Sequence, residues 1–414
     1  MEQRTALSSV SAFTYPGFQR YWAARLCVTL AIQMQAVAIG WQIYDLTRRP
    51  LDLGLVGLAQ FLPSLGLALV TGHVADRYDR RTVMALCIIV EALCAVLFLT
   101  FTLQGGTNTL FLFGVLVLFG TARAFEFPAS VALMPNLVPQ RLFTNAAAWS
   151  SSSWQVATIV GPAIGGLLYA IGPEAVYGCC ILMFLLSVFL VNTIRIEQRE
   201  REQVAATWKS VVAGISFIRG QPVVLGAASL DLFAVLLGGA TALLPVYARD
   251  ILYVGPWGLG LLRSAPAVGA LVTALIVARW PIQRHAGAIL LGAVGVFGLS
   301  IVVFGLSHNL WLSLLALTIL GASDMISVVI RRVLVLVKTP DDMRGRVSAV
   351  ESVFIGASNE LGEFESGVTA AWFGVVPAVV LGGLGTLAVV GLWARIFPQL
   401  RQVDSLEGER LEKH

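Results

Sequence analysis

Charged residues are scarce in this sequence. They make up only 13% of 414 residues, whereas about a quarter is usual in soluble domains, and 57% of the chain is hydrophobic. Such a composition excludes an ordinary soluble enzyme and a nucleic-acid-binding protein, both of which need a charged surface. It indicates a polytopic membrane protein.

Metal-binding and nucleotide-binding signatures are missing as well. The five cysteines lie in apolar runs, their number is odd, and their spacing matches no metal site, so we expect small core residues. The four histidines fall at expected loops or chain ends. Because no GxxxxGK[ST], HExxH or paired CxxC occurs, the sequence predicts neither ATP binding nor a zinc enzyme, and no cofactor or metal.

Apolar runs long enough to cross a bilayer fill most of the chain. We expect an all-α membrane protein with twelve transmembrane helices. The predicted spans are 19–46, 52–75, 82–103, 109–135, 142–170, 174–194, 222–247, 257–279, 286–306, 310–330, 346–373 and 376–397. No soluble catalytic domain fits outside them, and the polar N-terminal residues lack the apolar core of a removable signal peptide.

Lysine and arginine are distributed unevenly between the two sides of the membrane. If both termini are cytoplasmic, most of the 28 basic residues lie in cytoplasmic segments, Arg331 and Arg332 among them. The positive-inside rule therefore predicts that both ends of the chain are in the cytoplasm.

The chain divides in the middle and repeats. A polar linker at 196–210 separates an N-terminal bundle, 1–195, from a C-terminal bundle, 211–414. "GLAQFLPSLG" from Gly57 and "GLLRSAPAVG" from Gly260 match at both glycines, a leucine and a proline, with a constant separation of 203 residues. We therefore predict two pseudo-symmetric six-helix bundles, the architecture of alternating-access transporters.

A cluster of charges, "GHVADRYDRR" at 72–81, interrupts the apolar runs between the second and third spans. Gly72 would let a neighbouring helix approach closely. The arginines Arg77, Arg80 and Arg81 hold the loop in the cytoplasm, and Asp76 is placed to meet a helix N-terminus or an arginine. We expect a conformational gate, and the alternative is a loop that only fixes topology and packing.

This loop resembles the signature loop of the major facilitator superfamily, with Val74 in place of a leucine and Asp79 in place of the usual glycine. The openings "FQRYWAARL" at 18–26 and "TPDDMRGRVSAV" at 339–350 resemble the drug:proton antiporter branch that includes the enterobactin exporter and macrolide efflux proteins. The equivalent loop of the second half reads "VARWPIQRHAG" at 277–287. There Arg279 stands at the position that corresponds to Asp76, so the acidic residue of the first loop is missing. The resemblance covers nearly the whole chain and implies a bacterial inner-membrane location.

The fifth span contains "IVGPAIGGLL" at 159–168. Gly161, Pro162, Gly165 and Gly166 resemble the second half of the antiporter motif of family exporters, while Ala157 replaces an expected glycine. The motif favours efflux, although ordinary close packing of helices would select the same residues.

Ionisable residues inside a membrane are costly, so each is a functional hypothesis. Candidates for a proton-coupling carboxyl group are Asp231, Glu126, Asp324 and Glu360, with Asp231 first because it has no basic neighbour within a helical turn. Glu126 lies three residues after Arg123, and the alternative is that the two share a helix face and neutralise each other. Glu360 and Glu363 share a face too. Glu91 also falls inside a span but is not among the candidates.

A second group of residues is suited to a ligand cavity. Amides and aromatic rings spaced along an apolar helix suit a partly polar, aromatic ligand. The predicted cavity residues are Arg25, Gln33, Gln35, Trp41, Arg123 and Trp154.

Taken together, the residues and the resemblance predict a proton-coupled exporter of a small amphiphilic molecule, a siderophore or a hydrophobic drug. The expected partners are this substrate, protons and the lipid bilayer, and the expected functional unit is a monomer. Alternatives are a proton-driven importer or passive facilitator, a membrane sensor without transport, and an integral membrane enzyme. The acids are scattered through both halves instead of clustering at one interface, which disfavours the enzyme.

Overall fold

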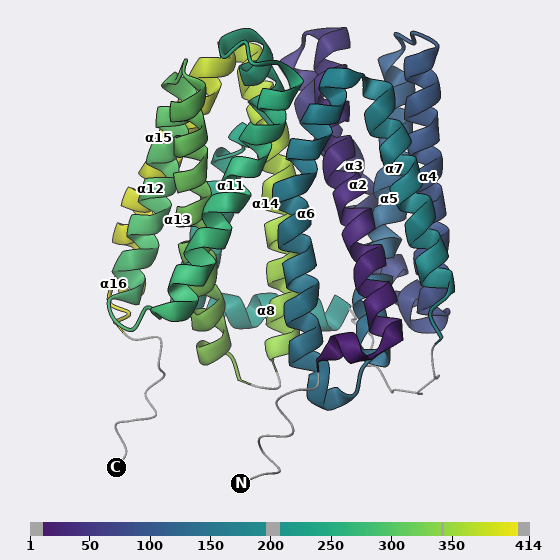
Figure 1. The fold of residues 1–414 in the computed structure, drawn as a ribbon. Helices are drawn as coiled ribbons and strands as arrows, with labels where there is room; N and C mark the ends of the chain where they lie inside the picture. Colours follow the sequence, from purple (N-terminus) through teal and green to yellow (C-terminus); the bar gives the residue numbers. More distant parts are fainter. Residues whose placement is uncertain (1–10, 196–207, 341–342, 405–414) are drawn as a thin grey trace. The chain divides into compact units, whose positions relative to one another are not determined.

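The computed structural model describes residues 11–195, 208–340 and 343–404, and this part of the chain is helical (Figure 1). Contacts divide the protein into two compact units. Unit 1 comprises Met1–Ile39 and Ala59–Ala205, and unit 2 comprises Gly40–Leu58 and Ala206–His414. The hairpin Gly40–Leu58 therefore packs with the second unit, while most of the predicted linker 196–210 lies outside the described residues.

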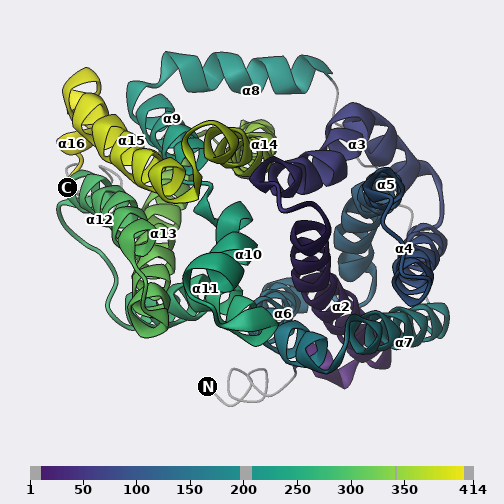
Figure 2. The same ribbon diagram turned by 90° about the horizontal axis from the view of Figure 1, so that it is seen from above.

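Unit 1 is built from long helices. They are α2 (Pro16–Thr47) and α3 (Pro50–Arg77), which it shares with unit 2, and α4 (Arg80–Leu103), α5 (Thr109–Leu133), α6 (Phe143–Ile171) and α7 (Pro173–Asn192), with the 3-10 turns η1 (Ala12–Thr14), η2 (Met134–Asn136) and η3 (Gln140–Leu142). α4 packs along both α5 and α7 (Figure 2). Their buried faces include the stacked rings of Phe98 and Tyr177.

Unit 2 contains the rest of the chain. Its helices are α8 (Trp208–Gly220), α9 (Pro222–Leu237), α10 (Leu244–Val246), α11 (Gly255–Arg279), α12 (Ala286–Leu306), α13 (Leu310–Lys338), α14 (Arg344–Phe373), α15 (Val375–Ile396) and α16 (Pro398–Arg401), with the short turns η4 (Ala240–Leu243) and η5 (Tyr247–Ile251). α8 runs across the long helices beside α9 and α14 (Figures 1 and 2). A buried apolar cluster that includes Leu230, Leu290 and Leu334 joins α9, α12 and α13.

Eleven described helical segments are long and apolar enough to cross a membrane. The helix α14 coincides with the eleventh predicted span and is 30 residues long. It is not one of the eleven segments, because its arginines and glutamates make it too polar. At 1.5 Å per residue it is about 45 Å long, which is ample for a bilayer. The predicted all-helical membrane architecture is confirmed.

Two spans differ from their predicted form. The seventh, predicted as continuous over 222–247, ends as a regular helix at Leu237. Gly238 and Gly239 follow, and a Cβ on Gly239 would lie 2.1 Å from the carbonyl oxygen of Gly362 in α14. Close backbone contact with α14 therefore interrupts the helix at these glycines. The tenth span continues past residue 330 to Lys338, so Arg331 lies buried within a helix and not in a loop.

The glycines of the fifth span bring α6 against α2 within unit 1. A Cβ on Gly161 would lie 2.7 Å from the Cβ of Gln33, and one on Gly165 would lie 2.8 Å from the Cα of Met34. Real Cβ atoms do not approach other atoms this closely. Both positions therefore need glycine in this packing arrangement, which is the close packing given as the alternative to an exporter-specific role.

We expect Gly165→Ala to destabilise the protein by about 1–3 kcal/mol, because the added methyl group overpacks the contact with Met34. The matched control is Gly178→Ala in α7, where no described atom lies within 4 Å of the added Cβ. Thermal unfolding in detergent should show a lower midpoint for the first variant and an unchanged or slightly higher midpoint for the second. Equal midpoints would contradict the close-packing role of Gly165.

Candidate functional site

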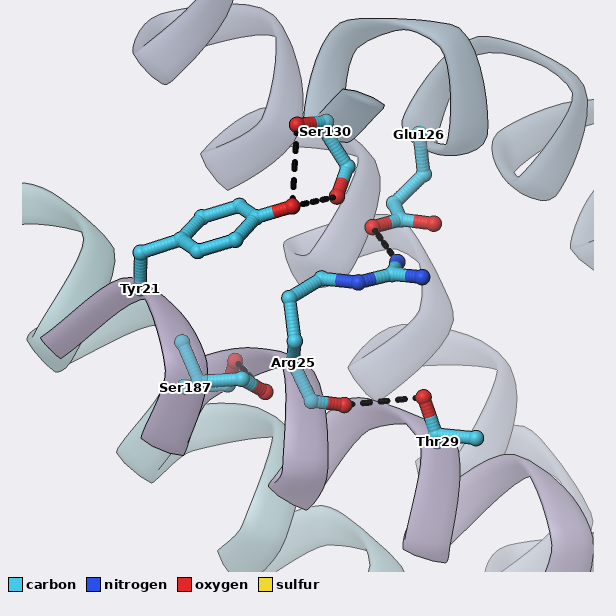
Figure 3. Close-up of polar contacts among 7 residues, drawn as sticks. Tyr21, Arg25, Thr29, Glu126, Ser130 and Ser187 are labelled. Atoms are coloured by element: carbon cyan, nitrogen blue, oxygen red, sulfur yellow. Dashed lines mark hydrogen bonds and ion pairs between the residues drawn. The ribbon is translucent and has the colours of Figure 1, made fainter. Parts of the chain in front are cut away.

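A buried ion pair connects α2 and α5 within unit 1 (Figure 3). The Arg25 Nη1 atom is 2.7 Å from Glu126 Oε1, and the two side chains are only 14% and 4% exposed. Arg25 comes from α2 and Glu126 from α5. Glu126 is thus neutralised by an arginine from another helix, and not by Arg123 on its own helix face, which was the alternative suggested by the sequence.

Helical spacing builds this cluster from both sides. Tyr21, Arg25 and Thr29 follow one another at intervals of four along one face of α2, and Glu126 and Ser130 do the same on α5. The Tyr21 hydroxyl donates to the Ser130 carbonyl oxygen at 3.1 Å, and Thr29 Oγ1 donates to the Arg25 carbonyl oxygen at 2.8 Å (Figure 3). These bonds fix the two faces around the ion pair.

Glu91, on α4, is the residue that the sequence analysis passed over. Its side chain is 0% exposed, and neither carboxyl oxygen has a hydrogen-bond partner within the described part of the chain. Glu126, Arg123 and Arg25 all lie within electrostatic range of it. Its position inside a span was the available signal, but nothing in the sequence indicated that it would be more deeply buried than the chosen candidates.

The other cavity candidates of unit 1 have different surroundings. Gln33 packs on Gly161, and Gln35 is fully buried, with no described partner for its amide atoms. Trp154 is 47% exposed and Arg123 is half-buried. Among these candidates, Arg25 and Arg123 are the two that lie near the carboxyl groups of Glu91 and Glu126.

A second buried ion pair lies in unit 2. Arg331 on α13 binds Asp231 on α9, and the side chains are 5% and 10% exposed. Asp231 has no basic neighbour within a helical turn in the sequence, but folding supplies one from 100 residues further along the chain. Arg331 was counted as a cytoplasmic residue, and its burial beside Asp231 corrects that assignment.

Asp231 lines two adjoining cavities. One is also bounded by Arg331, Glu351 and Phe354. The other brings Asp231 together with Asp324, a second predicted candidate. Each cavity has room for about one water molecule, so each fits water or a polar group of a ligand, but not a whole amphiphile.

Two further carboxyl groups meet at the hairpin of unit 2. A Cβ added to Gly57 would lie 2.9 Å from Oε2 of Glu360 and 2.9 Å from Oε2 of Glu363. Both acids of α14 therefore reach the same point on α3. Arg263 of α11 interacts electrostatically with Glu363. The shared helix face predicted for Glu360 and Glu363 thus brings their oxygens together at one glycine.

An unpredicted ionic cluster ties the same hairpin to the segment after α10. The Tyr44 hydroxyl donates to Asp250, Arg249 binds Asp45, and Arg48 Nη1 lies 3.4 Å from Asp250 Oδ1. The Arg249 guanidinium also lies over the ring of Trp41, 5.4 Å from its centroid. Trp41, a predicted cavity residue, is therefore covered by this cluster.

The predicted gating loop is held by its arginines. Arg80 donates to the Ala132 carbonyl oxygen at 2.9 Å and Arg81 donates to that of Ile194 at 2.9 Å, which ties the loop to the ends of α5 and α7. The side chain of Asp76 lies outside the described residues, and Arg77 is exposed. No described atom lies within 4 Å of a Cβ built on Gly72.

Asp79, which stands where the family loop usually has glycine, caps α4. Its carboxylate accepts hydrogen bonds from the backbone N–H of Arg81 at 3.1 Å and from the Thr82 hydroxyl at 3.0 Å.

We expect Asp79→Ala to lower the free energy of unfolding by about 0.5–2 kcal/mol and Asp79→Gly by only a few tenths, because glycine is itself a tolerated N-cap. Chemical unfolding in detergent measures both, and equal losses would contradict the capping role.

Long apolar helices, buried ion pairs in both units and small cavities beside ionisable groups are features of a secondary transporter. Residues 7–413 match the transmembrane secretion effector family, and the chain belongs to this family. It is therefore an efflux-type membrane transporter and not an enzyme.

Its relatives support this assignment over the whole chain. The enterobactin exporters EntS of Escherichia coli O1:K1 / APEC and Shigella boydii serotype 18 are each 26% identical over 398 residues, which cover 94% of this chain and 94% of theirs. Among solved structures, the bacterial homologue of the human lysosomal transporter Spinster in an occupied inward-facing conformation has a TM-score of 0.73 at 13% identity, over 93% of this chain and 97% of that one. The nucleoside transporter NupG has a TM-score of 0.70 at 12% identity, over 92% and 99%. These structures share the fold.

Proposed function

We propose that this protein is a proton-coupled exporter of a small amphiphilic molecule, a catecholate siderophore or a hydrophobic drug such as a macrolide. The observation that carries the proposal is the buried Asp231–Arg331 pair, which borders one cavity, while Asp231 also shares a second cavity with Asp324. Membership of an exporter family and the 26% identity to enterobactin exporters support efflux and favour the siderophore.

Competition at Asp231 provides the coupling. Its carboxylate attracts hydroxyl or ammonium donors of a substrate, and a proton on one oxygen turns that oxygen into a donor and removes the charge that attracts them. A proton also removes the negative charge that Arg331 binds, which releases the guanidinium and changes the contact between α9 and α13. Proton and substrate therefore exclude one another, which is the requirement for exchange.

The remaining features of the proposal follow from charge and repetition. Both termini are cytoplasmic, the protein resides in a bacterial inner membrane, and the transport unit is a monomer that works by alternating access. In the loop between α3 and α4, the contacts of Arg80 and Arg81 support a gate that is anchored to unit 1.

Transport into inside-out proteoliposomes tests this function. With an acidic lumen, protons leave through the protein, so a catecholate siderophore or a macrolide should accumulate inside the vesicles. Protein-free vesicles and vesicles without a pH gradient are the controls. Uptake that ignores the gradient would favour a passive facilitator, and accumulation driven by the opposite gradient would favour a proton-driven importer.

A further inference from the structure

Glu91 is a carboxyl group in an environment that does not suit a charge. Its side chain is fully buried in the middle of α4, and its two oxygens have no hydrogen-bond partner among the described residues. Removing an ionised carboxylate from water without a partner costs several kcal/mol, whereas the neutral acid is penalised far less. In unit 1, Glu126 has an arginine partner and Glu91 does not.

The neighbours of Glu91 show which charge could reach it. The helix α5 contributes Glu126 and Arg123, and α2 contributes Arg25. The other helix packed on α4 is α7, whose one charged residue, Glu174, lies in its first turn. On α4 itself, the flanking titratable groups are the thiols of Cys87 and Cys94. Arg25 therefore lies near two acids and is bound to one of them, Glu126.

We propose that Glu91 is a second proton-binding site of the transporter, located in unit 1. With Arg25 bound to Glu126, Glu91 carries the proton. When Arg25 moves to Glu91, the O–H bond at Glu91 breaks, an O–H bond forms at Glu126, and the guanidinium neutralises the new carboxylate. The charge of the cluster stays constant through this step. The inference rests on the proposed proton-coupled export and adds a residue of unit 1 that is required together with the Asp231–Arg331 pair of unit 2.

Infrared spectroscopy of the purified protein in lipid bilayers at neutral pH tests the proton directly. The wild type should show the carbonyl stretch of a protonated carboxylic acid, Glu91→Gln should lose that band, and Glu174→Gln, at an exposed position of α7, should keep it. Glu91→Asp should restore a band at a shifted frequency. A spectrum that Glu91→Gln leaves unchanged would overturn the proposal.

Transport assays distinguish a failure of the Glu91 proposal from a failure of the proposed function. In inside-out proteoliposomes with an acidic lumen, Glu91→Gln should lose gradient-driven uptake of a catecholate siderophore but keep exchange of labelled for unlabelled siderophore without a gradient. A merely structural role would reduce both. Full gradient-driven uptake by Glu91→Gln would overturn the proposal for Glu91 and leave the proposed function standing. Absence of such uptake in the wild type would overturn the proposed function itself.

Discussion

Asp231→Asn is expected to reduce gradient-driven uptake into inside-out proteoliposomes to the level measured without a gradient. Asparagine keeps the shape of the side chain and its ability to accept a hydrogen bond, but it cannot bind and release a proton. Exchange of labelled for unlabelled substrate, which needs no net proton movement, should therefore continue. The pair of assays distinguishes loss of coupling from loss of transport.

Two controls belong to this experiment. Glu174→Gln removes an exposed acid from the same protein and should leave uptake unchanged. Because Asp231→Asn leaves Arg331 buried without its counter-charge, Asp231→Asn/Arg331→Gln should recover stability without recovering coupling. Gradient-driven uptake that survives Asp231→Asn would contradict the assignment and transfer the coupling role to Asp324, Glu126 or Glu360.

The Arg25–Glu126 pair should give the largest effect on stability. Arg25→Met leaves the Glu126 carboxylate buried at 4% exposure with no partner in its ion pair, and we expect a loss of about 3–5 kcal/mol in the free energy of unfolding. Arg25→Met/Glu126→Leu removes both charges and should recover most of that loss. Chemical unfolding of the wild type, the single variants and the double variant closes the thermodynamic cycle.

The contrast between the single and double variants identifies the pair as a buried one. Breaking an exposed ion pair would lower the free energy of unfolding by about 1 kcal/mol or less, and the double variant would be no more stable than the single variant. The double variant should also fail in transport although it folds, because Glu126 and Arg25 belong to the proposed proton pathway of unit 1. A loss below about 1 kcal/mol for Arg25→Met would contradict the buried pair.

The sequence predicted the spans because apolar length and helix formation are local properties. The interruption after Leu237 was missed because the surrounding run is uniformly apolar, and only contact with Gly362 reveals why Gly239 is there. The end of the tenth span was placed too early, because two consecutive arginines are typical of a cytoplasmic boundary. Tertiary pairing of Arg331 with Asp231 overrides that rule.

The candidate sites were predicted less completely than the fold. Asp231 and Asp324 were selected separately, and folding places both at one cavity. Partners were not predictable, because Arg25 meets Glu126 and Arg331 meets Asp231 only after helices distant in sequence pack together. Glu91 was passed over because its distinguishing property, burial without a partner, exists only in three dimensions.

Proton movement during transport tests the central claim most directly. A pH-sensitive dye is trapped in inside-out proteoliposomes that have equal pH on both sides, and a catecholate siderophore is then added outside. Proton-coupled export predicts that the lumen becomes alkaline in step with siderophore entry, and that Asp231→Asn abolishes this change. Siderophore entry at constant luminal pH, or with acidification of the lumen, would contradict the account.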